Sequence, residues 1–375
     1  MPDLPREAHA LIDRIGERAG LVITLDGAVH DADLGEEGER AGVRLSRVGA
    51  HPDGEALLGA VQGLFSEADS SDALDDLATA FSADAIALTI PRGVELSRPV
   101  VIVNLLAMNN TDDSKGPALF PRTIVHLAEN SSATVIELLV SGPGAALVCP
   151  AAELSVGDGG RLSYSVVQQL GGRTWQLGHS WARAGRASTV RCFTASLGGE
   201  YARTRLDSLL DGPGGSAELL AAYLGDEHQV HDFRTLQEHA APKTTSDLVF
   251  KGAVGGTARS VYSGMIRMRH GARGGNAFQT NRNLVLSDGA HADSVPNLDI
   301  QENDVRCSHA SAVGPIDAEQ RFYLESRGIP RAAATRLILL GFFQELLARA
   351  EPAVQDHVVA SIRGRLEAMS DEAAS

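Results

Sequence analysis

The sequence is poor in cysteine. Its 375 residues include three, at Cys149, Cys192 and Cys307, and no two of them form a CxxC pair. A self-contained zinc site or four-cysteine cluster site is therefore excluded. An odd, sparse count also argues against the disulfide framework of a secreted protein. Any metal chemistry must use histidine, carboxylate or ligands from a second chain.

Long apolar runs and an excess of basic charge are also missing. The longest strongly apolar stretch, Leu337 to Leu347, is already interrupted by Gln344 and Glu345, whereas a membrane span needs roughly 20 apolar residues. The first twenty residues are acidic and amphipathic, unlike a signal peptide, so we expect a cytoplasmic protein without a membrane partner. The formal charge of −15 argues against nucleic acid as a partner.

Nucleotide-binding loops are absent as well. The segment DGPGGSAE at 211–218 is rich in glycine but lacks the lysine of a phosphate-binding loop. The segment GPGAAL at 142–147 lacks the third glycine of a dinucleotide fingerprint, and no βαβ pattern surrounds it. We therefore expect no nucleotide site and no catalytic residues in this chain.

Short β-branched runs dominate the chain from Ile86 to Gly314, and Gly, Pro, Asn and Ser bound them. Turn signals recur through this stretch, for example at 198–199, 211–215 and 274–275. Strands separated this regularly, without helices between them, predict an all-β sandwich, barrel or β-helix. Spacing alone does not choose among these, although the length of the stretch favours a β-helix, which grows by adding coils.

Helical patterns flank this β region. Before it we expect helices at 6–19, 54–65 and 71–81 (with Ser71 or Asp72 as N-cap), a strand at 22–27 and an acidic loop at 31–42. After it, Asp317 is the expected N-cap of a helix to Arg327, with Gly328 at C′. Pro330 then begins a helix to about residue 350, and a third spans 353–369. We therefore predict four segments: 1–83, mixed and helical; 84–315, the β core; 316–370, three helices; and 371–375, a disordered tail.

Five blocks in the C-terminal third resemble the SufB/SufD family of iron–sulfur cluster assembly proteins. They are SDLVFKG (246–252), NRNLVLSDGAHADSVPNLDI (281–300), DVRCSHASAVGPID (304–317), FYLESRGIP (322–330) and GFFQELL (341–347). The Cys-Ser-His stretch from Cys307 to His309 is similar to SufD, where SufB proteins carry an acidic stretch. Asn281 occupies the position that matches the essential cysteine of SufB. The chain is therefore more similar to SufD than to SufB.

The resemblance implies a fold and two partners. The fold is a right-handed parallel β-helix with a helical N-terminal region and a C-terminal three-helix domain. The partners are a SufB-type paralogue, paired through the end of the β-helix, and a SufC-type ATPase, bound by the helical domain. A homodimer in isolation is also compatible with this fold. The chain would hold no stable cofactor alone and would share a transient iron–sulfur cluster with SufB.

The site candidates follow from the spacing and from the resemblance. Cys307 and His309 stand two apart, so on a strand both side chains point to one face, and both are ligands for iron. The alternative is that Cys307 is a small core residue and His309 a polar interface residue. The expected contacts with SufB are Asn281, Asp304, Arg306, Cys307 and His309. The expected ATPase-binding residues are Tyr323, Ser326, Arg327, Gly328, Ile329, Pro330, Phe342 and Phe343.

Two other readings stay open. A group of carboxylates precedes Cys307, and paired carboxylates on a β-helix are typical of a polysaccharide lyase or hydrolase; its members are Asp288, Asp293, Asp299, Glu302 and Asp304. The low aromatic content of 5% argues against a sugar-binding groove. The second reading is a homodimeric interaction protein without a cluster role. A further cluster, His228, His231 and Asp232, is expected on the outer face of a coil.

Overall fold

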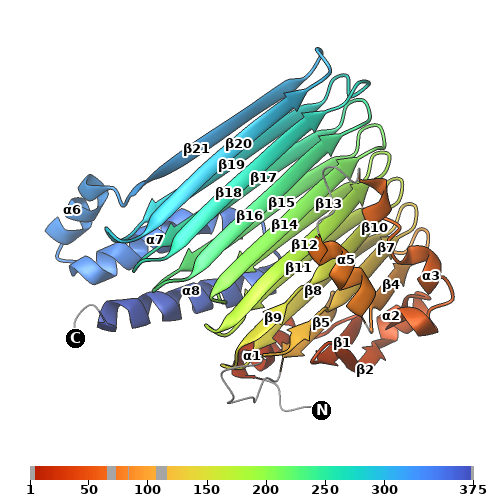
Figure 1. Cartoon of the computed structure of the whole chain (residues 1–375), viewed down its shortest axis with the longest axis horizontal. Coiled ribbons are helices and arrows are strands. Elements are labelled where there is room, and N and C mark those ends of the chain that lie inside the picture. The colour runs from red at the N-terminus through yellow and green to blue at the C-terminus, as the bar shows by residue number, and fades with distance from the viewer. Residues whose placement is uncertain (1–4, 66–72, 83, 107–115, 373–375) are drawn as a thin grey trace.

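The chain forms a parallel β-solenoid of about seven turns, with helices on its outer faces (Figure 1). The computed structural model describes residues 5–65, 73–82, 84–106 and 116–372. Successive strands of the solenoid alternate between two sheets, so neighbours within a sheet are one coil apart in sequence. The predicted fold class, mainly β with a β-helix core, is confirmed. The parallel register of these strands identifies a β-helix among the three architectures, sandwich, barrel and β-helix, that spacing left open.

The first sheet, sheet A, has the order β2 (Ala28–Leu34), β1 (Gly20–Leu25), β5 (Val100–Leu106), β8 (Ser132–Ser141), β11 (Arg161–Gln169), β13 (Thr189–Ser196), β15 (Ser216–Gly225), β17 (Thr245–Val254), β19 (Asn276–Val285) and β21 (Arg306–Pro315). The second, sheet B, has the order β20 (His291–Ile300), β18 (Arg259–Met268), β16 (Val230–His239), β14 (Tyr201–Leu210), β12 (Thr174–Ala184), β10 (Ala151–Val156), β7 (Arg122–Leu127), β4 (Ile86–Ile90) and β3 (Arg44–Arg47). The short strands β6 (Ala118–Leu119) and β9 (Ala146–Val148) pair beside β12.

The core between the sheets is built from columns of stacked side chains. In register across sheet A stand Val100, Val135, Tyr164, Cys192, Leu219, Leu248, Gln279 and His309. Because side chains alternate between the two faces of a strand, every member of such a column points inward. The inward set is apolar over most of the solenoid, which explains the β-branched and aliphatic runs of the sequence.

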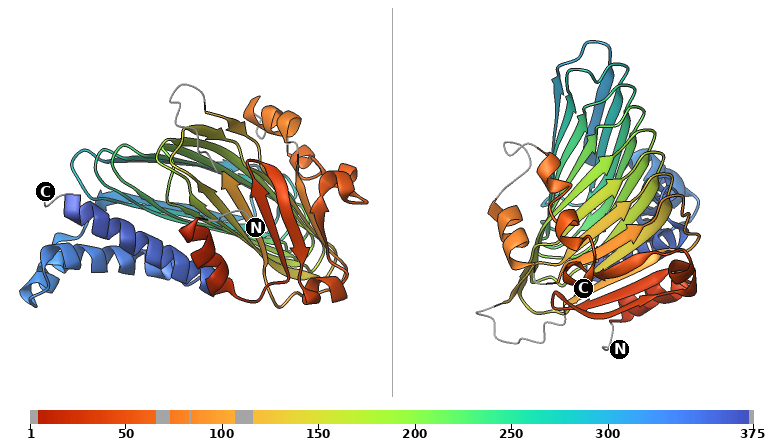
Figure 2. Two further views of the ribbon diagram at one scale, coloured as in Figure 1. Left: turned by 90° about the horizontal axis from the view of Figure 1, so that it is seen from below. Right: turned by 90° about the vertical axis from the view of Figure 1, so that its right-hand side faces the viewer.

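Helices cover the outer face of each sheet (Figure 2). On sheet A lie α1 (Arg6–Ile15), α7 (Arg331–Leu347) and α8 (Pro352–Glu372), and Lys251 ties α7 to β17 through Glu345 and the Phe342 carbonyl. On the early coils of sheet B lie α3 (Gly54–Leu57), η2 (Gln62–Leu64) and α5 (Ala73–Phe81). We call residues 54–65 and 73–81 the N-terminal cover. The remaining helices are α2 (Glu36–Arg40), η1 (Val48–Ala50) and α6 (Ala318–Ser326).

The two ends of the solenoid differ. At the N-terminal end the antiparallel strands β2 and β3 close the sheets, and β2 carries the exposed charges Asp31 and Asp33. Charged, short edge strands of this kind prevent further pairing. At the C-terminal end β20 and β21 are the last strands of their sheets, and among the described strands each has a neighbour on one side only. We call this surface the open end.

The helix boundaries predicted from the sequence agree best with the structure in the C-terminal helices. The Asp317 side chain accepts hydrogen bonds from the N–H groups of residues 319 and 320, as an N-cap does, and Gly328 has a φ of 84°. Pro330 is the N-cap of α7, and α8 continues to Glu372, two residues into the expected tail. No helix among the described residues has the length and apolar character that crossing a membrane requires.

The N-terminal predictions need three corrections. The acidic loop expected at 31–42 is mostly β2 and α2, because β2 pairs with β1 across a tight turn at Asp26 and Gly27. The helix expected at 54–65 is two short pieces, α3 and η2. The first helix ends at Ile15, where Gly16 adopts a φ of 66°. The N-cap predicted at 71 or 72 lies outside the described residues.

Candidate functional site

The last strand of sheet A places Cys307 and His309 on the same face, as the sequence predicted. Cys307 is in register with Ala277 of β19, and His309 with Gln279. Ala277 and Gln279 are buried in the core, so the two candidate ligands point toward the interior side of the solenoid, about 7 Å apart along the strand. Because no further coil covers them, His309 is exposed and Cys307 is only half-buried.

The interior becomes polar as it approaches the open end. On β17 the inward positions hold Leu248, Phe250 and Gly252, whereas on β19 the same columns hold Gln279, Asn281 and Asn283. The Asn281 and Asn283 amides are hydrogen-bonded to each other and to Tyr223, whose hydroxyl donates to the Asn283 Oδ1 atom. The Tyr223 ring crosses the space above Gly252, where any Cβ atom would collide with it. The open end is therefore lined with amide groups beneath Cys307 and His309.

The Cys307 thiol has an apolar environment. It packs with Val305 against a cluster formed by Ile266, Met268, Ala272 and Ala277. Burial raises the pKa of the Cys307 thiol, so the neutral thiol is favoured in the isolated chain. Iron binding requires the thiolate. Iron binding at Cys307 would therefore release the thiol proton.

Cys307 and His309 do not form a metal site by themselves. Among the described residues, no three His, Cys, Asp or Glu side chains gather closely enough to hold a metal ion. Two ligands on one strand leave the remaining coordination positions of an iron–sulfur cluster empty. Within the described residues, Cys307 and His309 therefore offer only two of the ligands that a cluster needs.

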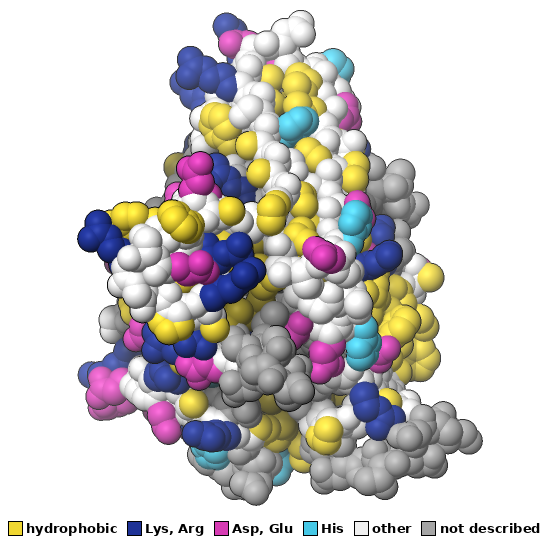
Figure 3. Space-filling view, turned by 90° about the vertical axis from the view of Figure 1, so that its left-hand side faces the viewer, with side chains coloured by type: hydrophobic (Ala, Val, Ile, Leu, Met, Phe, Trp, Pro, Cys, Tyr) yellow, Lys and Arg dark blue, Asp and Glu magenta, His cyan; other side chains and the backbone are white. Residues whose placement is uncertain are grey.

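The open end has the properties of an interaction surface. β20 and β21 are ten residues long, and long exposed edge strands are templates for pairing with another chain. Four large apolar side chains on these strands are exposed, Val295, Leu298, Ile300 and Val313, the first to 53% and the last to 45%. Figure 3 views the molecule from the side where β21 and α6 lie, and hydrophobic side chains recur along its tapering upper part.

The α6/α7 hairpin carries a second exposed surface. Tyr323 is 58% exposed, with the Arg327 guanidinium 5.2 Å from its ring centre, and Phe322 is 71% exposed. Ser326, Arg327, Gly328 and Pro330 are exposed, whereas Ile329 and Phe342 are half-buried. The prediction for Phe343 needs correction, because its side chain is fully buried between α7 and sheet A. The sequence reasoning omitted Phe322, although its neighbour Tyr323 was included.

A model of the core domain of SufBD proteins, from the SUF system of iron–sulfur cluster assembly, matches residues 108–342. An iron–sulfur cluster assembly SufBD family protein of Mycobacterium tuberculosis is 36% identical over 283 residues, which is 73% of this chain and 70% of that protein. The chain belongs to the SufB/SufD family. The expected family is therefore confirmed.

Within the SufB/SufD family, the chain is SufD-like. The iron–sulfur cluster assembly protein SufD of Bacillus subtilis is 30% identical over 258 residues, covering 68% of this chain and 58% of that protein. SufD of Escherichia coli is 29% identical over 284 residues, covering 74% of this chain and 66% of that protein.

The structure separates the expected SufB contacts into two groups. The edge strand β21 carries Arg306, Cys307 and His309. Asp304 lies in the turn before this strand and forms an ion pair with Arg273 at 2.8 Å. Asn281 is one strand further in and buried. Its side chain therefore lines the interior beneath the open end and does not reach the surface.

Four of the five carboxylates before Cys307 have partners of their own. Asp299 pairs with Arg267, Asp304 with Arg273, and Asp293 with His291. Glu302 accepts N–H groups of its own turn and of residue 271. The other polar cluster needs one correction. His231 points into the core, where burial lowers its pKa to about 3. His228 is exposed in the turn before β16, and Asp232 lies on the opposite face of β16 from His231, where it accepts a hydrogen bond from the Tyr201 hydroxyl.

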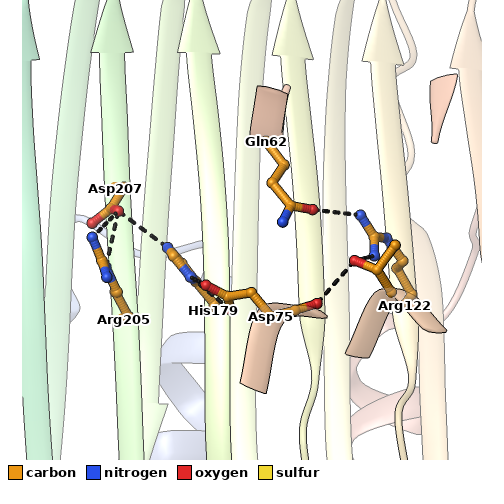
Figure 4. A network of polar contacts seen from close by, with 7 residues as sticks. Gln62, Asp75, Arg122, His179, Arg205 and Asp207 are labelled. Carbon is orange, nitrogen blue, oxygen red and sulfur yellow. Dashed lines mark hydrogen bonds and ion pairs between the residues drawn. The ribbon is translucent and has the colours of Figure 1, made fainter. Parts of the chain in front are cut away.

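A buried polar network beneath the N-terminal cover was missed by the sequence reasoning (Figure 4). Arg122 of β7 and Glu153 of β10 form an ion pair of 2.6 Å with side chains 1% and 0% exposed. Glu153 also accepts three backbone N–H groups from residues 59–62, and Arg122 reaches Gln62 and Thr79. The ion pair therefore holds the N-terminal cover on sheet B, mainly through the backbone N–H groups that donate to Glu153.

A second part of this network lies beside Trp181. The His179 imidazole contacts Asp75 of α5 at 2.9 Å and Asp207 of β14 at 3.1 Å, and Arg205 contacts Asp207 at 2.9 Å. Burial alone would lower the pKa of His179, but the two carboxylates outweigh burial and the pKa is raised. The imidazole links α5 to β14 through its two carboxylate contacts, so we assign these residues to holding α5 in place.

Proposed function

We propose that this chain is the SufD-type scaffold subunit of an iron–sulfur cluster assembly complex and that it pairs with a SufB-type paralogue through its open end. The open end is the observation that carries the proposal. Its two edge strands offer unpaired backbone groups and apolar side chains, and a second solenoid stacked on them would continue both sheets. The closed, acidic N-terminal end supports a single pairing surface rather than a filament.

The chain supplies part of a cluster site and is not an enzyme in this proposal. His309 is the first ligand candidate because it is exposed, and Cys307 is the second because its thiol must leave an apolar pocket to ionise. The cluster is cargo, assembled transiently between the two chains, so the isolated chain holds no stable cofactor. ATP hydrolysis belongs to a SufC-type ATPase bound at the α6/α7 hairpin.

His309→Ala is expected to leave pairing intact and to lower cluster formation several-fold, because one ligand is lost while the edge strand keeps its backbone. The measurement is anaerobic reconstitution of the co-purified complex, followed by absorbance in the visible cluster bands. Ser311→Ala, on the same face of β21, is the control and should leave the yield unchanged. Equal yields for His309→Ala and wild type would remove His309 from the ligand set.

Phe322→Ala combined with Tyr323→Ala is expected to weaken ATPase binding at least about tenfold, since exposed aromatic side chains dominate interface energies. Titration calorimetry with the purified SufC-type ATPase measures the affinity. Phe81→Ala is the matched control, because Phe81 is also an exposed aromatic residue on a helix but lies on the N-terminal cover. Loss of binding in the control alone would place the ATPase elsewhere.

A second copy of the chain is the competing occupant of the open end. Light scattering of a mixture with the SufB-type paralogue separates the two outcomes. The proposal expects that any homodimer formed in isolation exchanges into a heterodimer. A homodimer that persists in excess paralogue would favour an interaction protein without a cluster role.

A further inference from the structure

Gln279 breaks the apolar column to which it belongs. The two preceding inward positions in that column are Leu219 and Leu248, and the following one is His309. The Gln279 side chain is only 2% exposed, and within the described structure neither its Oε1 nor its Nε2 atom has a hydrogen-bond partner. Buried amides are rarely left without partners, so an unsatisfied one calls for a functional explanation.

Within the described residues, the neighbours of the Gln279 amide complete no hydrogen bond with it. Leu248, in register with Gln279 on β17, offers no polar group. Across the interior lies Gly264, where an added Cβ atom would be 3.0 Å from the Gln279 Nε2 atom, so the glycine leaves room for the amide. The nearby Tyr262 hydroxyl is already paired with Thr235 at 3.2 Å. Toward the open end, His309 is the inward residue in register with Gln279, on a strand about 4.8 Å away.

We propose that Gln279 is a positioning residue for His309. When the open end is closed by a partner chain, the Gln279 Oε1 atom accepts a hydrogen bond from one ring N–H of His309 and so fixes the tautomer and the orientation of the imidazole. The other ring nitrogen then directs its lone pair toward the shared site. Ligand histidines commonly use their second nitrogen in this way. The inference rests on the proposed role of His309 as a ligand.

The amide suits this task better than the residues that precede it in the column. A leucine in this position would bury the same volume but offer no acceptor, and a carboxylate would bring a charge into the interior. Glutamine supplies an acceptor without a charge. Its burial keeps water from competing for the imidazole N–H, whereas His309 itself stays accessible from the open end.

Nitrogen NMR of histidine-labelled protein tests the inference on the complex with the SufB-type paralogue and on the isolated full chain. The spectrum of His309→Asn identifies the His309 signals among those of the twelve histidines. In the complex, Gln279→Leu is expected to shift the tautomer ratio of His309 by about three- to tenfold, the effect of losing one hydrogen bond.

Gln237→Leu is the matched control. Gln237 is also a buried inward amide, but it lies on β16, where its Nε2 atom donates to Ser246 and reaches the Phe278 carbonyl rather than facing His309. It should leave the tautomer ratio of His309 unchanged. An unchanged ratio in Gln279→Leu would overturn the inference, and so would an equal shift in Gln237→Leu. Tautomer populations are read without any cluster, so failure of the ligand role of His309 in reconstitution would not be confused with failure of the Gln279 contact.

Discussion

Arg122→Met and Glu153→Ala are each expected to lower the free energy of unfolding by about 3–5 kcal/mol. The two side chains form a fully buried ion pair, and loss of either one leaves the other charge in the interior without its counterion. Glu153→Ala also removes the acceptor for three backbone N–H groups of residues 59–62. Denaturant titration followed by tryptophan fluorescence measures the loss, because Trp181 is buried beneath the same cover.

The control for this prediction is another ion pair between coils. Arg161 and Glu95 lie 2.9 Å apart but are exposed, so Glu95→Ala should cost less than about 1 kcal/mol. The double variant Arg122→Met/Glu153→Gln should recover part of the loss of Arg122→Met, because no unpaired charge then remains. Similar small losses for Glu153→Ala and Glu95→Ala would contradict the clamping role of the buried pair.

Val295→Lys combined with Val313→Lys is expected to weaken pairing with the SufB-type chain by about 100-fold or more. Both residues are exposed at the open end, Val295 on β20 and Val313 on β21. Enclosing two ammonium groups in an apolar contact opposes association, whereas lysine on a free edge strand is well tolerated, so the variant should still fold. Surface-immobilised binding assays give the two dissociation constants.

Leu77→Lys is the matched control for the pairing prediction. Leu77 has a comparable exposure but lies on α5, on the N-terminal cover. It should leave the affinity for the SufB-type chain unchanged. Equal affinities for the double variant and the wild type would show that the open end is not the pairing surface.

The β region could be predicted from its short β-branched runs, although spacing left sandwich, barrel and β-helix open. The shared face of Cys307 and His309 could be predicted for a simple reason. Alternation with a period of two places Cys307 and His309 on one face wherever the strand begins, and the structure confirms this. The same rule could have placed His231 correctly, because it has the parity of the buried Phe233 on β16. Its assignment to the outer face ignored that apolar neighbour.

The N-terminal cover was beyond sequence reasoning because its contacts are long-range. Arg122 and Glu153 are separated by a whole coil, and Asp75 and His179 by 104 residues. Nothing in the sequence around these four residues distinguishes them from charged residues that face solvent. The acidic segment around Asp31 likewise reads as a loop, because its strand forms only through antiparallel pairing with the buried strand β1.

Hydrogen–deuterium exchange of this chain with and without the SufB-type paralogue tests the central claim most directly. Free N–H groups of an edge strand exchange rapidly, and pairing with another strand protects them. The proposal predicts new protection in peptides covering residues 291–315 and unchanged exchange in those covering β2 at 28–34. Protection at β2, or at the N-terminal cover with none at 291–315, would contradict the proposed pairing through the open end.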